Sequence, residues 1–219
     1  MADFSRQLPR TLWLGLGLLA ALCALAGMLS LLETRTIPPR TLPMLGQVAN
    51  FTLTNQDARV TTLADLSNRV WVADIIFTRC AGPCPRMTAQ MQSLQESLPP
   101  ASEARLVTLT TDPDHDTPAV LKRYGERFGA DYNRWTFLTG TKREIAGLAG
   151  DSLKLSAVPV KAADRKDDAD LFIHTTIFVV VDKHAQLRGI FETGGDGVDW
   201  TNSVRPHLLA TLHELEVEK

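Results

Sequence analysis

The sequence predicts a mixed α/β domain, in which a central β-sheet carries helices on both faces. Apolar, β-branched runs alternate with amphipathic helical stretches from about residue 49 to the C-terminus. With 219 residues and 44% hydrophobic content, the chain is long enough for one compact domain plus an extension. A single uncharged apolar run near the N-terminus stands outside this alternation, so we expect the extension at that end.

The apolar run at residues 12–32, LWLGLGLLAALCALAGMLSLL, contains no charged residue. About 20 apolar residues suffice to cross a bilayer as a helix, so we expect a transmembrane anchor here and a cytoplasmic tail at 1–11. Cleavage as a signal peptide is the alternative, because residues 24–26 read Ala-Leu-Ala. Either way the remainder is exported. We therefore expect a single-pass inner-membrane protein whose C-terminal domain lies in the periplasm or an equivalent oxidising compartment.

The exported part begins with a linker and a hairpin. Residues 33–48 contain three prolines and little periodicity, which is typical of a semi-rigid spacer, so we expect the folded domain over 49–219. Residues 51–66 alternate apolar and polar around Asn55-Gln56-Asp57, as a β-hairpin does. Residues 70–77, VWVADIIF, form the nearly continuous apolar run of a central strand covered on both faces.

Helices and strands then alternate to the end of the chain. The patterns predict helices over 85–98, 117–128, 141–150 and 200–215, and strands over 104–111, 135–140, 175–182 and 185–192. Two cysteines stand where the first central strand ends and the next helix begins. This order of elements predicts a thioredoxin-like domain.

Cys80 and Cys84 are separated by three residues, and Pro85 follows directly. Proline suits the first turn of a helix, so Cys84 should lie near the N-cap. The positive end of the helix dipole favours thiolate, the form needed for disulfide exchange or for a soft metal. Thioredoxin-like reductases use two intervening residues, whereas three leave room for both sulfurs to face one Cu(I) or Zn ion. A structural cysteine pair is the alternative.

His174 is the histidine whose position suggests a third ligand. It directly precedes the predicted strand 175–182, whose start faces the cysteine loop in a thioredoxin-like sheet. Reductases of that fold place a proline there, and this chain does not. A purely structural histidine is the alternative. The other histidines lie in a carboxylate-rich loop, at a hairpin tip and on the last helix: His115, His184, His207 and His213.

Four segments together resemble the SCO/SenC family of copper chaperones: DIIFTRCAGPCPRMT, TTDPDHDTPAVLKRYGERFGAD, WTFLTG and IHTTIFVVVDKHAQLRG. The resemblance covers about residues 45–215. It implies a membrane-anchored, thioredoxin-fold protein that binds copper through Cys80, Cys84 and His174 and helps to assemble the dinuclear copper centre of cytochrome c oxidase. The implied partners are a copper-receiving subunit of that oxidase and other copper chaperones or thiol reductants. Asp112 to Pro118 match a family motif, in which we expect Asp116 or Thr117 to cap the following helix.

The leading hypothesis is therefore a metallochaperone that holds Cu(I) in a nearly trigonal site; Cu(II) with an added ligand stays open. The alternative is a thiol–disulfide oxidoreductase that reduces the cysteines of a copper-receiving subunit through a mixed disulfide. A peroxidase is disfavoured, because Phe77 and Ala73 stand where peroxiredoxin sites carry threonine and proline. The net charge of −2 offers no basic field for nucleic acid.

Overall fold

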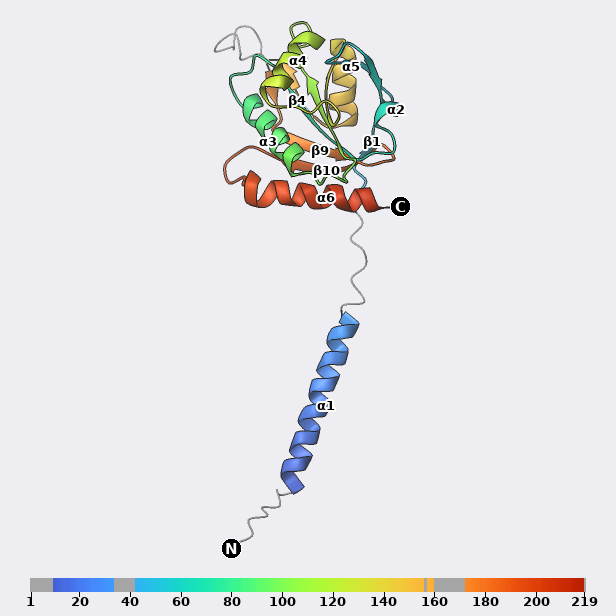
Figure 1. Ribbon diagram of the computed structural model, residues 1–219, viewed down its shortest axis with the longest axis vertical. Helices are drawn as coiled ribbons and strands as arrows, with labels where there is room; N and C mark the ends of the chain where they lie inside the picture. The colour runs from blue at the N-terminus through green and yellow to red at the C-terminus, as the bar shows by residue number, and fades with distance from the viewer. Residues whose placement is uncertain (1–9, 34–41, 156, 160–171, 219) are drawn as a thin grey trace. The chain divides into compact units, whose positions relative to one another are not determined.

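The computed structural model describes residues 10–33, 42–155, 157–159 and 172–218 (Figure 1). The chain divides into two compact units, Met1–Thr41 and Leu42–Lys219.

The described residues of the N-terminal unit, 10–33, form one helix, α1, over Arg10–Glu33. The structure thus confirms a helix over the apolar run 12–32. Among the helices in the described ranges, none is both long and apolar enough to cross a membrane. The structure therefore supports the helix but not the membrane span that the sequence predicted.

The C-terminal unit is built on an eight-stranded sheet of order β1-β10-β9-β4-β5-β6-β2-β3. The strands β4, β5 and β6 are parallel, and the other neighbours pair antiparallel. Two further strands, β7 and β8, pair antiparallel as a separate ribbon. The bounds are β1 Gly46–Gln47, β2 Thr52–Asn55, β3 Val60–Thr62, β4 Trp71–Ile76, β5 Arg105–Thr110, β6 Trp135–Thr139, β7 Ala157–Pro159, β8 Phe172–His174, β9 Ile177–Val181 and β10 Gln186–Glu192.

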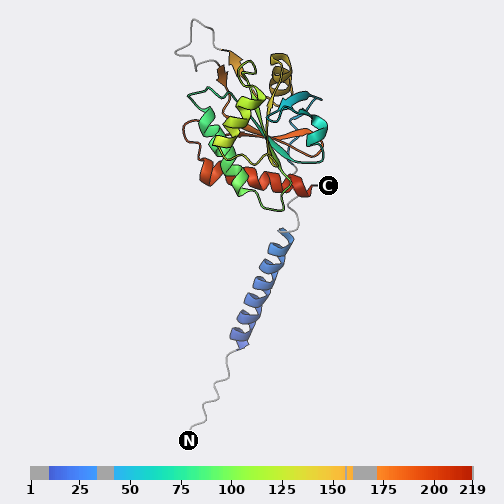
Figure 2. The same cartoon turned by 45° about the horizontal axis from the view of Figure 1, so that its top comes forward.

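Helices cover both faces of this sheet (Figures 1 and 2). One apolar core lies between the sheet and α3, α4 and α6, and a second lies on the other face under α2 and α5. The mixed sheet with helices on both faces is the thioredoxin-like arrangement that the sequence predicted. The bounds are α2 Leu63–Leu66, α3 Cys84–Ser97, α4 Pro118–Arg127, α5 Lys142–Ala146 and α6 Arg205–Val217, with π-helical turns at Gly147–Ser152 and Trp200–Val204.

The folded unit begins earlier than the predicted boundary at residue 49. Gly46 and Gln47 pair with β10 as an edge strand, and Val48 is buried. The sequence gives no sign of this strand because two residues cannot show an alternating pattern; β10 supplies the pairing. Residues 42–48 of the expected linker 33–48 thus belong to this unit, and residues 34–41 lie outside the described part of the chain.

The parallel strands bring two loops to the same edge of the sheet. β4 and β5 lie side by side in parallel register, from Trp71 opposite Arg105 to Ile76 opposite Thr110. The loop after β4 carries the two cysteines, and the loop after β5 carries Asp112 and Asp116. Ligand sites of open α/β sheets form at such carboxyl ends, so the candidate site lies at this edge.

Candidate metal centre

Cys84 is the first residue of α3 and is fully buried. Pro83 occupies the N-cap position and its carbonyl accepts a hydrogen bond from the Met87 amide at 3.0 Å, which closes the first turn. Pro85 lies within this turn, where its missing N–H is no loss. The predicted place of the second cysteine, at the amino end of a helix, is confirmed.

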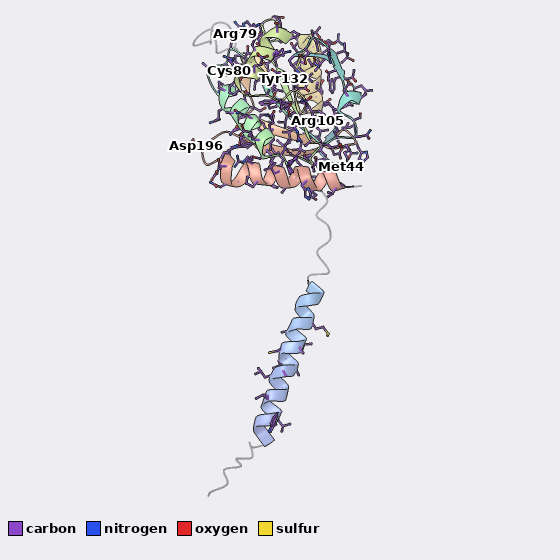
Figure 3. All side chains as sticks on the ribbon, viewed as in Figure 1. Met44, Arg79, Cys80, Arg105, Tyr132 and Asp196 are labelled. Atoms are coloured by element: carbon purple, nitrogen blue, oxygen red, sulfur yellow. The ribbon has the colours of Figure 1, made fainter. Side chains whose placement is uncertain are left out.

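Cys80 lies on the loop between β4 and α3 and is half-buried. Its amide donates a hydrogen bond to the Phe77 carbonyl at 3.2 Å, so the chain turns as soon as the strand ends. A Cβ on Gly82 would lie 3.8 Å from the Cys80 sulfur, in ordinary contact. Figure 3 shows Cys80 beside Arg79 at the edge of the domain. Of the two thiols, Cys80 is therefore the one that solvent or a partner can reach.

The electrostatic surroundings of Cys84 differ from the prediction. A side-chain hydrogen bond with Cys80 and burial together raise the pKa of the Cys84 thiol far above its usual value, and only the backbone at Phe77 acts in the opposite direction among the larger causes. The sequence predicted a thiolate favoured by the helix dipole. The hydrogen bond with Cys80 and the loss of hydration both favour the protonated form of Cys84, and so act against the thiolate that the sequence predicted.

His174 is the last residue of β8 and pairs with Ala157 of β7. It precedes the first residue of β9, Ile177, by three positions. β9 runs antiparallel to β4, so its start lies at the same sheet edge as the cysteine loop. The position of the His174 side chain is outside the described part of the structure, and its role as a ligand stays a prediction.

A hydrogen-bonded connection ties the segment after His174 to the cysteine helix. The Thr176 carbonyl accepts hydrogen bonds from the Thr193 amide at 2.7 Å and from its hydroxyl at 2.8 Å. The Thr193 carbonyl in turn accepts from the side-chain amide of Gln90 on α3, at 2.8 Å. The backbone two residues after His174 is thus fixed relative to the helix that begins with Cys84. Sequence reasoning missed Thr193 and Gln90, because the contact between them joins residues 103 positions apart.

The loop after β5 agrees with one of the two predicted caps, Thr117, and differs for the other, Asp116. Thr117 occupies the N-cap of α4 but makes no side-chain cap hydrogen bond, and Asp116 does not cap the helix. The Asp116 side chain is buried and faces Thr78 in the cysteine loop. The only sequence signal for this contact was the position of both loops at the carboxyl ends of neighbouring parallel strands.

Fold and site together define a thioredoxin-like protein with a cysteine pair at a strand-to-helix junction. The SCO1/SenC family model matches residues 43–208, and the chain belongs to this family. The SCO1 protein homolog of Bacillus subtilis (strain 168) is 34% identical over 141 residues, which cover 64% of this chain and 70% of that protein.

Solved structures of the same family share the fold. The structure of BsSco, described as a member of the Sco family of cytochrome c oxidase assembly proteins, is similar with a TM-score of 0.67 and 26% identity, over 82% of this chain and 100% of that one. ScoI of Bradyrhizobium japonicum with copper bound is similar in fold, with a TM-score of 0.63 and 20% identity, over 77% of this chain and 99% of that one.

Proposed function

We propose that this protein is a copper metallochaperone that holds copper through Cys80, Cys84 and His174 and delivers it to the copper centre of cytochrome c oxidase. The observation that carries the proposal is the cysteine pair, whose side chains hydrogen-bond to each other at the sheet edge where the His174 segment also arrives. Two thiolates and an imidazole suit Cu(I). Membership of the SCO1/SenC family supports the proposal, since one relative is a cytochrome c oxidase assembly protein and another was solved with copper bound.

The two thiols would have different parts in binding and transfer. Cys84 is buried and its pKa is raised, so it keeps its proton in the metal-free protein and releases it when a metal ion binds. Cys80 is half-buried on a loop, where an acceptor's thiolate can approach the ion before the donor sulfur leaves. Ligand exchange would therefore begin at the Cys80 side of the site.

Anaerobic titration of the reduced full chain with Cu(I), against a colorimetric Cu(I) chelator, tests this proposal. Wild type should bind one Cu(I), and His174→Ala should weaken binding at least tenfold (about 1.4 kcal/mol). His184→Ala is the matched control, because His184 is an exposed histidine on the β9–β10 turn. Equal affinities for His174→Ala and wild type would remove His174 from the ligand set.

The alternative function is a thiol–disulfide oxidoreductase that reduces the cysteines of a copper-receiving subunit. The asymmetry of the pair favours it: in such exchange an accessible thiol attacks and a neighbouring buried one resolves the mixed disulfide. A disulfide switch is described for BsSco, and this also favours a redox role for the cysteine pair. If wild type reduces a disulfide-bonded peptide readily while His174→Ala leaves Cu(I) affinity unchanged, the oxidoreductase is the better assignment.

We further propose that the domain works outside the cytoplasm, attached to the inner membrane through residues 12–32. The support is the uncharged apolar sequence of that run. Fractionation of cells that express the full chain tests it. Recovery in the membrane fraction, with the domain accessible to protease only after the outer membrane is opened, is the expected result, and recovery in the cytosol contradicts it.

A further inference from the structure

Asp116 is a fully buried carboxylate that gathers four hydrogen-bond contacts. Its Oδ2 accepts from the Thr78 amide at 3.0 Å and from the Thr110 hydroxyl at 2.5 Å. Its Oδ1 accepts from the Thr78 hydroxyl at 2.5 Å and lies 3.0 Å from Nδ1 of His115. Two of these four contacts go to one residue, Thr78, which stands two positions before Cys80.

Arg79, the residue between Thr78 and Cys80, is also held by the loop after β5. The guanidinium of Arg79 donates to the Asp112 carboxylate at 2.6 Å, and the Asp112 amide donates to the Thr110 hydroxyl at 3.0 Å. The two residues that lead into Cys80 are therefore both fastened to the loop after β5. Cys84 is fixed separately, by its position in the first turn of α3.

Two other roles for Asp116 and its neighbours Asp112 and His115 fit the contacts less well. Capping of α4 is excluded, because Thr117 is at the N-cap and the Asp116 oxygens point to Thr78 and Thr110. Possible ligand atoms of Asp112, His115 and Asp116 lie within 4.8 Å of one another, as in a metal site. The carboxylate oxygens of Asp116 are already occupied by hydroxyl and amide donors, however, and a cation would have to displace them.

We propose that Asp116 is a positioning residue that holds the Thr78–Cys80 segment so that the Cys80 sulfur stays within reach of Cys84. This inference rests on the proposed function, because it concerns the same pair of sulfurs. A carboxylate with amide and hydroxyl donors is a stiff connection, since the charge strengthens each hydrogen bond. Without it, the segment that leads into Cys80 is less firmly attached to the loop after β5. The two sulfurs then spend less time at the spacing that one ion or one disulfide needs.

The test compares Asp116→Asn and Thr78→Val with a matched control, Asp182→Asn. The amide of the Asp116→Asn variant keeps the shape of the side chain but is neutral and accepts at only one end. Either the Thr78 amide loses its acceptor, or the Thr78 hydroxyl must reverse and accept from the new NH2 group, and the charge that strengthened each bond is gone. Asp182 is similarly buried and also accepts several hydrogen bonds, from the His184 and Gln186 amides and the Arg188 guanidinium. It lies on the β9–β10 turn, at the other end of β9 from the cysteine loop.

Cu(I) affinity and the reduction potential of the cysteine pair are measured on each full chain, together with its melting temperature. We expect Asp116→Asn to weaken Cu(I) binding about 10- to 100-fold, as loss of a partner that orients a ligand does. We expect Thr78→Val also to weaken Cu(I) binding. The double variant should lose less binding free energy than the sum of the two single variants, because both remove the same contact between Thr78 and Asp116. Asp182→Asn should lower the melting temperature and leave Cu(I) affinity within about twofold of wild type.

The reduction potential separates this inference from the copper proposal. A looser Cys80 loop lowers the effective concentration of the two thiols, so the disulfide becomes easier to reduce; a tenfold change raises the potential by about 30 mV. If wild type binds no Cu(I), the proposed function fails while the potentials still test Asp116. If Asp116→Asn leaves both the potential and the affinity at wild-type values, or Asp182→Asn changes them equally, Asp116 has no positioning role.

Discussion

The unequal burial of the two thiols predicts that alkylation distinguishes them. Cys80 is half-buried, whereas Cys84 is fully buried and its pKa is raised above the ordinary 9.0. The nucleophile is the thiolate. At pH 8.0 a thiol with an unshifted pKa of 9.0 is about 10% thiolate, and every further unit removes another factor of ten. Burial adds the cost of opening the first turn of α3, so Cys80 should react at least about tenfold faster than Cys84.

The assay uses the reduced, metal-free full chain carrying Cys23→Ser, which removes the exposed third thiol. A limiting amount of iodoacetamide is added at about pH 8, and peptide mapping by mass spectrometry gives the modified fraction of each cysteine over time. The same reagent in denaturant should modify Cys80 and Cys84 at similar rates, which serves as the control. Equal rates in the native protein would refute the reasoning from burial and pKa.

Three further predictions concern stability. Because the pKa of Cys84 is raised in the folded protein, the unfolded chain loses this proton first as pH rises. The free energy of unfolding of the reduced protein should therefore fall as pH rises above 9.0. Measured by urea unfolding, this fall should be about 1.4 kcal/mol smaller in Cys84→Ala than in wild type by about pH 10. Gly125→Ala should cost about 1–3 kcal/mol, because its Cβ would lie 2.8 Å from a Phe137 ring carbon; calorimetry without a fall in melting temperature would contradict this. Arg188→Ala should cost about 3–5 kcal/mol in the same urea unfolding, since it leaves the buried Asp182 without its cation, yet Cu(I) binding should persist.

The sequence predicted the sheet and helices well where patterns were long. The run 70–77 became β4, all six residues of which are buried, and Pro85 marked the start of α3 within one residue. The sequence did not predict the shortest strands. β1 has two residues and β8 three, and such strands are stabilised by their pairing with β10 and β7 rather than by a pattern of their own.

For the cysteine loop, the sequence predicted the position in the fold but not the protonation of the thiols. Its place between β4 and α3 followed from local signals, an apolar run and two prolines. Whether Cys84 would be a thiolate did not, because its pKa depends on burial and on the hydrogen bond with Cys80. The sequence allowed either Asp116 or Thr117 as the cap of α4, and Thr117 is the N-cap residue. It could not show that Asp116 bonds Thr78 instead, because Thr78 lies 38 residues earlier in the chain.

By itself, then, the sequence determined the fold class, the cysteine pair at a helix start and the likeness to SCO/SenC proteins, since these depend on periodicity and motif spacing within short windows. Only the tertiary structure decided which thiol is buried, which carboxylate fastens the loop before Cys80, and which side chains tie the His174 segment to α3. These depend on contacts across parallel strands and between distant loops. Burial and hydrogen bonding there set proton affinity and position, and neither can be read from a linear pattern.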